Sequence, residues 1–183
     1  MSDRLEVTLR PEQPGDETAV RRVNDAAFGR ALEGGIVDAI RGTDRWIDGG
    51  SLVARDGDGH VVGHVLLSEG DLVASDGSGR RIWMVGPVAV LPAVQGQGIG
   101  SALMEAAIAL AKERAQPVLC LVGHATYYPR FGFEPARALG IEPPEPWADE
   151  NWLALRLPGW DASVHGLARY PAAFSNGAAC TVG

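Results

Sequence analysis

This chain of 183 residues has few cysteines, no long apolar run and fewer basic than acidic residues. Two cysteines, Cys120 and Cys180, provide no disulfide framework of the kind that stabilises small secreted domains. No apolar run reaches the length of a membrane span, and the polar start at residues 1–4 is unlike a signal peptide. The net charge of −7 makes nucleic acid and anionic membranes poor partners. The sequence therefore predicts a cytoplasmic protein that binds neither nucleic acid nor membranes.

Several catalytic and metal-binding patterns are also absent from the sequence. No Gly-x-Ser-x-Gly element exists to support Ser-His-Asp chemistry. His60 and His64 fall in or beside a strand without a cysteine pair, so no metal site is predicted. Cys120 lies in an apolar strand run, which favours a buried thiol over a nucleophile. No repeat or linker divides the chain, so we expect one domain over residues 1–160, with 161–183 as a C-terminal extension packed on it or trailing from it.

Hydrophobic periodicity outlines an alternation of strands and helices. Helices are expected over residues 16–29, 32–40 and 99–115, and strands over 5–9, 51–55, 60–68, 81–90, 118–122, 133–139 and 152–157. This order is typical of one α/β domain.

Residues 95–101, Gln-Gly-Gln-Gly-Ile-Gly-Ser, form the most informative stretch of the chain. They follow the apolar run 83–91 and open the amphipathic stretch 99–115, so they predict a turn from a strand into a helix. Such a turn gathers backbone N–H groups at a helix N-terminus, which carries roughly half a positive charge. The stretch therefore predicts a site for phosphate or pyrophosphate.

The spacing of these glycines distinguishes among phosphorylated ligands. A dinucleotide fingerprint requires G-x-G-x-x-G and an acidic residue that closes the next strand. Here Ser101 takes the third glycine position, and residues 117–123 contain no Asp or Glu, which disfavours a nucleotide-binding oxidoreductase. A Walker loop requires Gly-Lys-Ser/Thr, and no lysine lies near. What fits is Gln95-x-x-Gly98-x-Gly100, the pattern Q/R-x-x-G-x-G/A.

This pattern, with the segment 88–92 (Val-Ala-Val-Leu-Pro) before it and 127–135 (Tyr-Tyr-Pro-Arg-Phe-Gly-Phe-Glu-Pro) after it, resembles the GNAT superfamily of acetyl-CoA-dependent N-acetyltransferases. The specific part of the resemblance covers about residues 80–136, and the order of elements matches more loosely over most of the chain. It implies an α/β fold with a mixed, mostly antiparallel central sheet that is flanked by helices. The sheet would splay after the strand ending near Val90, with the cofactor in the gap.

The resemblance further implies acetyl-CoA as cosubstrate and no metal. The loop would hold the pyrophosphate, and the backbone of residues 88–90 would pair with the pantetheine arm as an added strand would. Gly86-Pro87 fits a β-bulge that would turn a backbone N–H toward the thioester oxygen. The residues expected to bind the cofactor are Val88, Ala89, Val90, Gln95, Gly96, Gln97, Gly98, Ile99, Gly100 and Ser101.

Tyr128 stands four residues before Gly132, where the GNAT pattern places its general-acid tyrosine, and its neighbour Tyr127 is expected in the core. An alkyl amine also needs a general base, because only about one part in a thousand is neutral at pH 7. No single base stands out. The candidates are His124, Glu33, His64 and Glu69, and each has an alternative interpretation as a surface or hydrogen-bonded polar residue.

By resemblance, the chain is an N-acetyltransferase acting on a primary amine of a small molecule or peptide. Transfer would be direct, in a ternary complex. The alternative is a non-catalytic acyl-CoA-binding or sensing domain of the same fold. Tyr128 disfavours that alternative, whereas the lack of a clear base favours it. Dimers are common in the family, so a homodimer is compatible with the resemblance.

Overall fold

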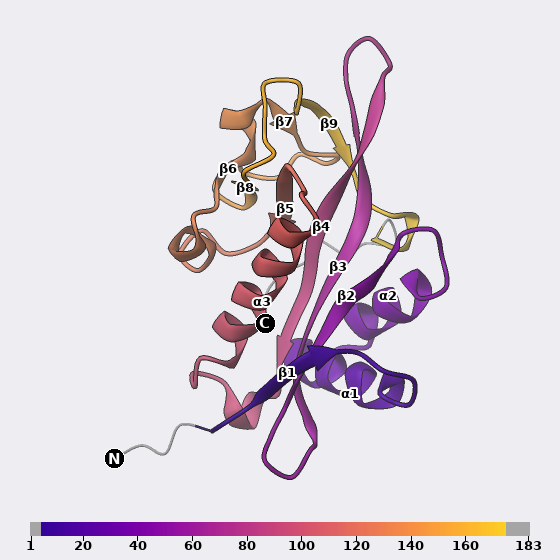
Figure 1. The fold of residues 1–183 in the computed structure, drawn as a ribbon, viewed down its shortest axis with the longest axis vertical. Coiled ribbons are helices and arrows are strands. Elements are labelled where there is room, and N and C mark those ends of the chain that lie inside the picture. The colour runs from indigo at the N-terminus through magenta and orange to yellow at the C-terminus, as the bar shows by residue number, and fades with distance from the viewer. Residues whose placement is uncertain (1–4, 175–183) are drawn as a thin grey trace.

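A mostly antiparallel sheet with helices on both faces organises residues 5–174, which are the residues that the computed structural model describes (Figure 1). The helices are α1 (Glu17–Phe28), α2 (Leu32–Ile40) and α3 (Ile99–Glu113). The strands are β1 (Thr8–Pro11), β2 (Trp46–Arg55), β3 (Val61–Val73), β4 (Gly79–Val90), β5 (Val118–Val122), β6 (Glu134–Pro135), β7 (Ile141–Glu142), β8 (Trp152–Arg156) and β9 (Gly166–Arg169). Short 3-10 turns are η1 (Pro92–Val94), η2 (Tyr128–Phe131), η3 (Ala136–Leu139) and η4 (Ala172–Phe174).

The strands follow the spatial order β1-β2-β3-β4-β5-β8-β6, and β9 pairs with both β3 and β7. The pairings β4–β5 and β7–β9 are parallel, and the other described pairings are antiparallel. The predicted fold class, a mixed and mostly antiparallel sheet flanked by helices, is therefore confirmed.

Side-chain alternation along the central strands builds separate hydrophobic clusters, two of which involve β2. Leu52 and Ala54 of β2 pack on the side of α3, where Leu103 joins them. Val53, between them in sequence, points to the other face and packs with Val23 of α1 and residues of α2. This follows from the two-residue period of a strand, which sends neighbours to opposite faces. In Figure 1, α3 and the pair α1–α2 accordingly lie on opposite sides of the sheet.

The sheet opens between β4 and β5. These parallel strands pair at only two described positions: Trp83 lies opposite Leu119, and Met84 lies opposite Cys120. Residues 85–90 of β4 continue to pair with β3 on one side but make no described ladder contact with β5 on the other. The predicted splay is therefore present, and it leaves a strand edge inside the molecule.

A β-bulge interrupts β4 at the start of this open edge. The register passes from Val65 opposite Val88 to Leu67 opposite Val85. One residue of β3, Leu66, thus faces the two residues Gly86 and Pro87 of β4, which is the definition of a bulge. The bulge lies at the predicted position.

Two predicted elements differ from the structure. The strand expected at 133–139 is reduced to β6, because Pro135 cannot donate to a ladder and the chain then turns through η3. The first strand is shifted along the chain, from the expected residues 5–9 to β1.

The expected C-terminal extension, 161–183, is described only as far as residue 174. That part packs on the sheet: β9 pairs with β3, and the side chains of Val164 and Ala168 are fully buried. Residues 175–183, which include Cys180, lie outside the described residues.

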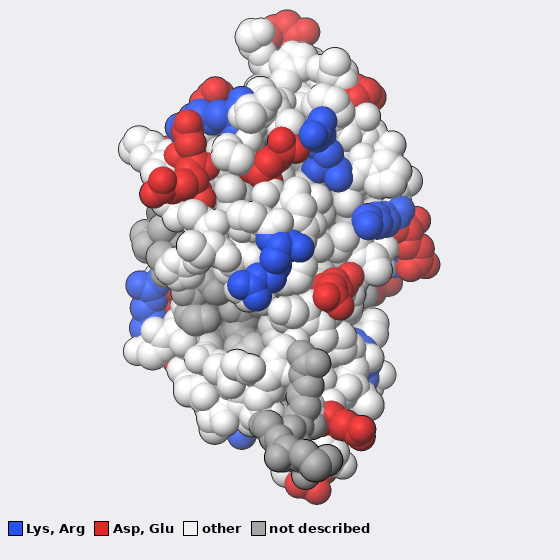
Figure 2. Space-filling view, turned by 90° about the vertical axis from the view of Figure 1, so that its left-hand side faces the viewer, with Lys and Arg blue, Asp and Glu red and all other residues white. Residues whose placement is uncertain are grey.

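Charged side chains of both signs are interspersed on the face shown in Figure 2, with uncharged surface between them. Within residues 5–174, no helix combines the length and apolar character required to cross a bilayer.

Candidate active site

The glycine-rich loop and the first turn of α3 form the predicted phosphate site. Gly96 and Gly98 have φ angles of +77° and +87°, in the left-handed region that favours glycine, and Gly98 is the N-cap of α3. Gly100 is helical, but a Cβ added there would lie 3.1 Å from the Tyr127 hydroxyl. Backbone conformation therefore requires the first two glycines, and close approach of a neighbouring residue requires the third.

A cavity of about 560 Å³ opens beside this loop. Of the residues predicted to bind the cofactor, it is lined by Val88, Val90, Gln95, Gly96, Gly98, Ile99, Gly100 and Ser101. The cavity therefore joins the loop to the open edge of β4.

Two residues of the predicted set do not line this cavity. Ala89 is only 1% exposed, and it packs on the α1–α2 face, because neighbours on a strand alternate. The side-chain oxygen of Gln97 accepts a hydrogen bond from the backbone N–H of Leu5 at 2.9 Å. Gln97 thus holds the segment before β1 against the loop.

Gln95 braces the loop against the end of β4. Its side-chain nitrogen donates to the carbonyl oxygen of Val90 at 3.0 Å. This hydrogen bond fixes the distance between the glycine-rich turn and the open strand edge, the two parts of the cavity.

The two neighbouring tyrosines lie in different environments. Tyr128 is 2% exposed and does not line the cavity; its ring packs edge-on against that of Phe133 and lies against the backbone of Gly123. Tyr127 does line the cavity, while its ring contacts the core from outside. The expectation that Tyr127 is a core residue was therefore wrong for its hydroxyl end.

Sequence reasoning missed four residues that line the cavity: Val94, Thr126, Tyr127 and Arg130. Arg130 is exposed, and its Nε donates to the Tyr127 carbonyl at 2.9 Å. The Arg130 guanidinium carbon also lies 4.6 Å from the centroid of the Tyr127 ring, a cation–π distance. The available signal was an arginine within the tyrosine segment, close to a predicted anion site in an acidic protein.

Among the candidate bases, His124 reaches the cavity, at the end of β5. Glu33 of α2 is fully buried and pairs with Arg30, and it does not line the cavity. Glu69 pairs with Arg81 at 3.3 Å. The structure thus brings together His124 and the loop, but neither glutamate.

His64 belongs to a buried polar network on the α1–α2 face. Its Nδ1 accepts from the Asn24 amide at 3.0 Å, so its Nε2 carries the proton that is donated to Ser51 at 2.9 Å. The Ser51 hydroxyl in turn donates to Glu12, which pairs with Arg41 at 2.6 Å. Burial, and then the nearby Arg41 charge, lowers the pKa of His64 to about 3. His64 is therefore the hydrogen-bonded core residue of the alternative interpretation.

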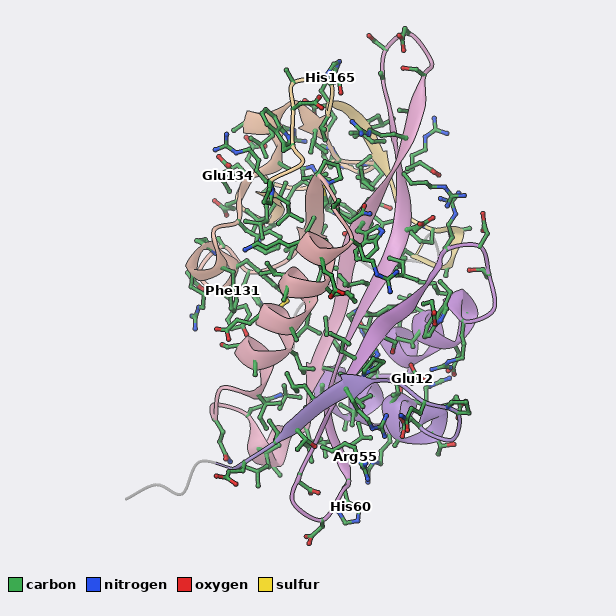
Figure 3. The ribbon with its side chains drawn as sticks, viewed as in Figure 1. Glu12, Arg55, His60, Phe131, Glu134 and His165 are labelled. Atoms are coloured by element: carbon green, nitrogen blue, oxygen red, sulfur yellow. The ribbon has the colours of Figure 1, made fainter. Side chains whose placement is uncertain are left out.

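Other reactive groups are equally accounted for. Cys120 is fully buried, and burial raises the pKa of its thiol, which agrees with the predicted inert cysteine. Asp56, Asp58 and His60 lie close together in the β2–β3 turn, whose tip carries His60 (Figure 3). There the Asp56 carboxylate accepts the backbone N–H groups of Asp58 and His60, so it stabilises the turn.

Comparisons with known proteins agree with this architecture. Residues 48–135 match the acetyltransferase (GNAT) domain family. The chain is 31% identical over 158 residues to the uncharacterised N-acetyltransferase YjhQ of Escherichia coli strain K12, covering 84% of this chain and 86% of that protein. The chain therefore belongs to the GNAT family of acetyltransferases, and it is an acyltransferase by this membership.

Two solved structures are also similar over nearly the whole chain. The GNAT family N-acetyltransferase YhbS of Escherichia coli, in complex with CoA, aligns with a TM-score of 0.84, 26% identity and 98% coverage of both chains. A GNAT family acetyltransferase of Brucella melitensis, in complex with acetyl-CoA, aligns with a TM-score of 0.75 and 32% identity, covering 92% of this chain and 98% of that one.

Proposed function

We propose that the chain transfers an acetyl group from acetyl-CoA to a primary amine, directly and in a ternary complex. The observation that carries the proposal is one continuous cavity with a phosphate-type loop at one end and an unpaired strand edge along its wall. CoA combines a pyrophosphate with an extended arm that contains amide groups. The complexes of the Brucella and Escherichia coli structures with acetyl-CoA and CoA support the same ligand here.

The loop and the strand edge divide the binding of this cosubstrate between them. Backbone N–H groups at the start of α3 would hold the pyrophosphate, helped by the positive end of the helix. The backbone of residues 88–90 pairs with no residue of β5, although the Val90 carbonyl accepts a hydrogen bond from Gln95. Its remaining groups would pair with the amides of the arm, as in β-strand addition. The bulge at Gly86 would turn a backbone N–H toward the thioester oxygen and stabilise the charge that develops there.

We assign the general acid to Tyr128, and its place in sequence supports this role, four residues before Gly132 and directly after the cavity-lining Tyr127. The Tyr128 ring packs against the backbone of Gly123, the residue that follows β5, and its neighbour Tyr127 lines the cavity. A phenol of pKa about 10 facing a thiolate of pKa about 8.5 makes proton transfer uphill by about 2 kcal/mol, which the departing negative charge can offset.

His124 is the residue that we assign to deprotonate the amine, because it is the one candidate base that lines the cavity. An imidazole can accept a proton near neutral pH, which suits an α-amine better than a more basic alkyl amine. The acceptor would be a small molecule or a peptide with such an amine.

Binding is tested by thermal unfolding with CoA, acetyl-CoA, NAD and NADP in parallel. A ligand at 100 times its dissociation constant adds about 2.7 kcal/mol to the free energy of unfolding. We expect stabilisation by CoA and acetyl-CoA and little by NAD or NADP, because the strand after α3 lacks an acidic residue to bind the ribose hydroxyls. Stabilisation by NAD equal to that by CoA would contradict the cofactor assignment.

Catalysis is tested with a panel of amines and detection of the free thiol of CoA. Direct transfer predicts intersecting double-reciprocal plots and no exchange of label between acetyl-CoA and CoA when the amine is omitted. Parallel plots with such exchange would instead indicate a covalent acetyl-enzyme intermediate.

A further inference from the structure

Arg130 is a positively charged side chain held at the cavity without a negatively charged partner. Many other described arginines, such as Arg10, Arg21 and Arg41, pair with carboxylates. Arg130 makes no ion pair with any acidic residue of the described chain, although the protein carries a net charge of −7. Among the residues that line the cavity, it is also the only lysine or arginine.

The position of Arg130 is fixed by contacts that leave its charge available. Its Nε donates to the Tyr127 carbonyl, and its planar group stacks on the Tyr127 ring. The two terminal nitrogens make no hydrogen bond with described residues, so the fork that binds phosphate oxygens is unoccupied by protein. Because stacking already restricts the rotamers of Arg130, binding an anion costs less side-chain entropy.

Tyr127 brings this charge to the loop. Its hydroxyl lies 3.1 Å from the point that a Cβ on Gly100 would occupy, so it stands over the first turn of α3. In Figure 3, Phe131, the last residue of η2, lies on the side of the molecule that carries α3. The η2 segment therefore faces the backbone N–H groups of the loop from across the cavity.

From these contacts we propose that Tyr127 and Arg130 form the side-chain half of the phosphate site, binding the pyrophosphate of the cosubstrate opposite the backbone of residues 96–101. The proposal rests on acetyl-CoA being the cosubstrate. It gives the adjacent tyrosines separate roles, with Tyr127 holding phosphate and Tyr128 acting at the thioester. Arg130 and Tyr127 are then cosubstrate-binding residues, which act on affinity rather than on the chemical step.

The test compares the affinities of CoA and dephospho-CoA for the wild type and for Arg130→Gln by calorimetry. Both ligands retain the pyrophosphate, and dephospho-CoA lacks only the 3′-phosphate. We expect Arg130→Gln to weaken both by about tenfold. Arg130→Lys, which keeps the charge but loses the planar fork, is expected to fall between wild type and Arg130→Gln. Tyr127→Phe keeps the stacking ring and is expected to weaken both ligands by about threefold.

Arg114→Gln is the matched control, because it removes the same charge from an exposed arginine at the opposite end of α3. Equal weakening in Arg114→Gln would attribute the effect to net charge and overturn the proposal. Loss of affinity for CoA alone would assign Arg130 to the 3′-phosphate, which also overturns it, as would unchanged affinity for both ligands. If the folded wild type binds neither ligand, the assignment of acetyl-CoA itself fails. That result is distinct from failure of the roles proposed for Tyr127 and Arg130 alone.

Discussion

On the α3 side of the sheet, backbone atoms of residues 95–101 face an open cavity, whereas on the α1–α2 side Asn24, Ser51 and His64 are sealed from solvent. The enclosed side chains are joined by a continuous run of hydrogen bonds that ends at Glu12, although the Asn24 side-chain oxygen is buried without a hydrogen-bond partner among the described residues. The open side has no such network: the loop, the edge of β4 and Arg130 line a cavity that protein does not fill. The histidine and the serine of the α1–α2 side are therefore structural, and the phosphate-binding part of the open side is built largely from backbone.

The strongest test of this comparison adds a side chain to the open face. We expect Gly100→Val to weaken acetyl-CoA binding by about 100-fold or more, about 2.7 kcal/mol, because the new methyl groups meet the Tyr127 hydroxyl and occupy the approach to the helix N–H groups. Gly35→Val in α2 is the control, since a Cβ there meets no atom within 4 Å. Near wild-type affinity of a folded Gly100→Val protein would rule out the loop as the phosphate cradle.

The second test separates the two tyrosines of the open face. Tyr128→Phe is expected to lower kcat by about 100-fold with little change in cofactor affinity, because it removes the proposed proton donor and keeps the packing ring. Tyr127→Phe is expected to leave kcat unchanged. Single-turnover rates, which report the chemical step, provide the measurement. A full chemical rate in Tyr128→Phe would remove Tyr128 from the acid role.

The third test probes the closed face through the pH dependence of stability, and its effect per pH unit is the smallest of the three. The folded state holds His64 neutral down to a pKa of about 3, whereas the unfolded chain binds the proton near pH 6.5. The stabilisation is thus fully present above pH 6.5 and is lost as the pH falls from 6.5 toward 3. The free energy of unfolding should fall by up to about 1.4 kcal/mol per pH unit in this window from this group.

His64→Gln supplies the comparison for this titration, because its amide can hydrogen-bond to Ser51 but does not titrate. Urea unfolding at several pH values should give a steeper decline for wild type than for the variant below pH 6.5. Parallel declines would mean that the imidazole is protonated in the folded state.

The sequence predicted the loop and the bulge because each depends on local chemistry, whereas the splay was predicted only through the resemblance to the GNAT superfamily. Gly98 is required by its own φ angle, and Pro87 is unable to donate to a ladder whatever its surroundings. A strand that alternates apolar and polar residues, or a helix with a periodic stripe such as α3, is likewise encoded within a short window.

What the sequence could not supply depends on contacts between distant segments. β9 forms because β3 and β7 offer edges to it, and its own four residues carry no strand pattern. Tyr127 and Tyr128 are identical in type and adjacent, so only the path of η2 decides which one is buried. Gln97 falls within the glycine pattern, yet its side chain binds a backbone N–H far away in sequence.

The position of the unpaired β4 edge bears on strand pairing between molecules. Exposed strand edges at the rim of a sheet recruit other chains, and edge-to-edge pairing is a common route to aggregation. Here the free edge at residues 85–90 lies between β4 and β5, within the sheet rather than at its rim. A foreign strand would have to force these two strands apart to reach it, whereas a slender extended molecule can enter along the cavity. An opening at the centre of the sheet thus leaves backbone groups for an extended ligand without an exposed strand edge there for other proteins to pair with.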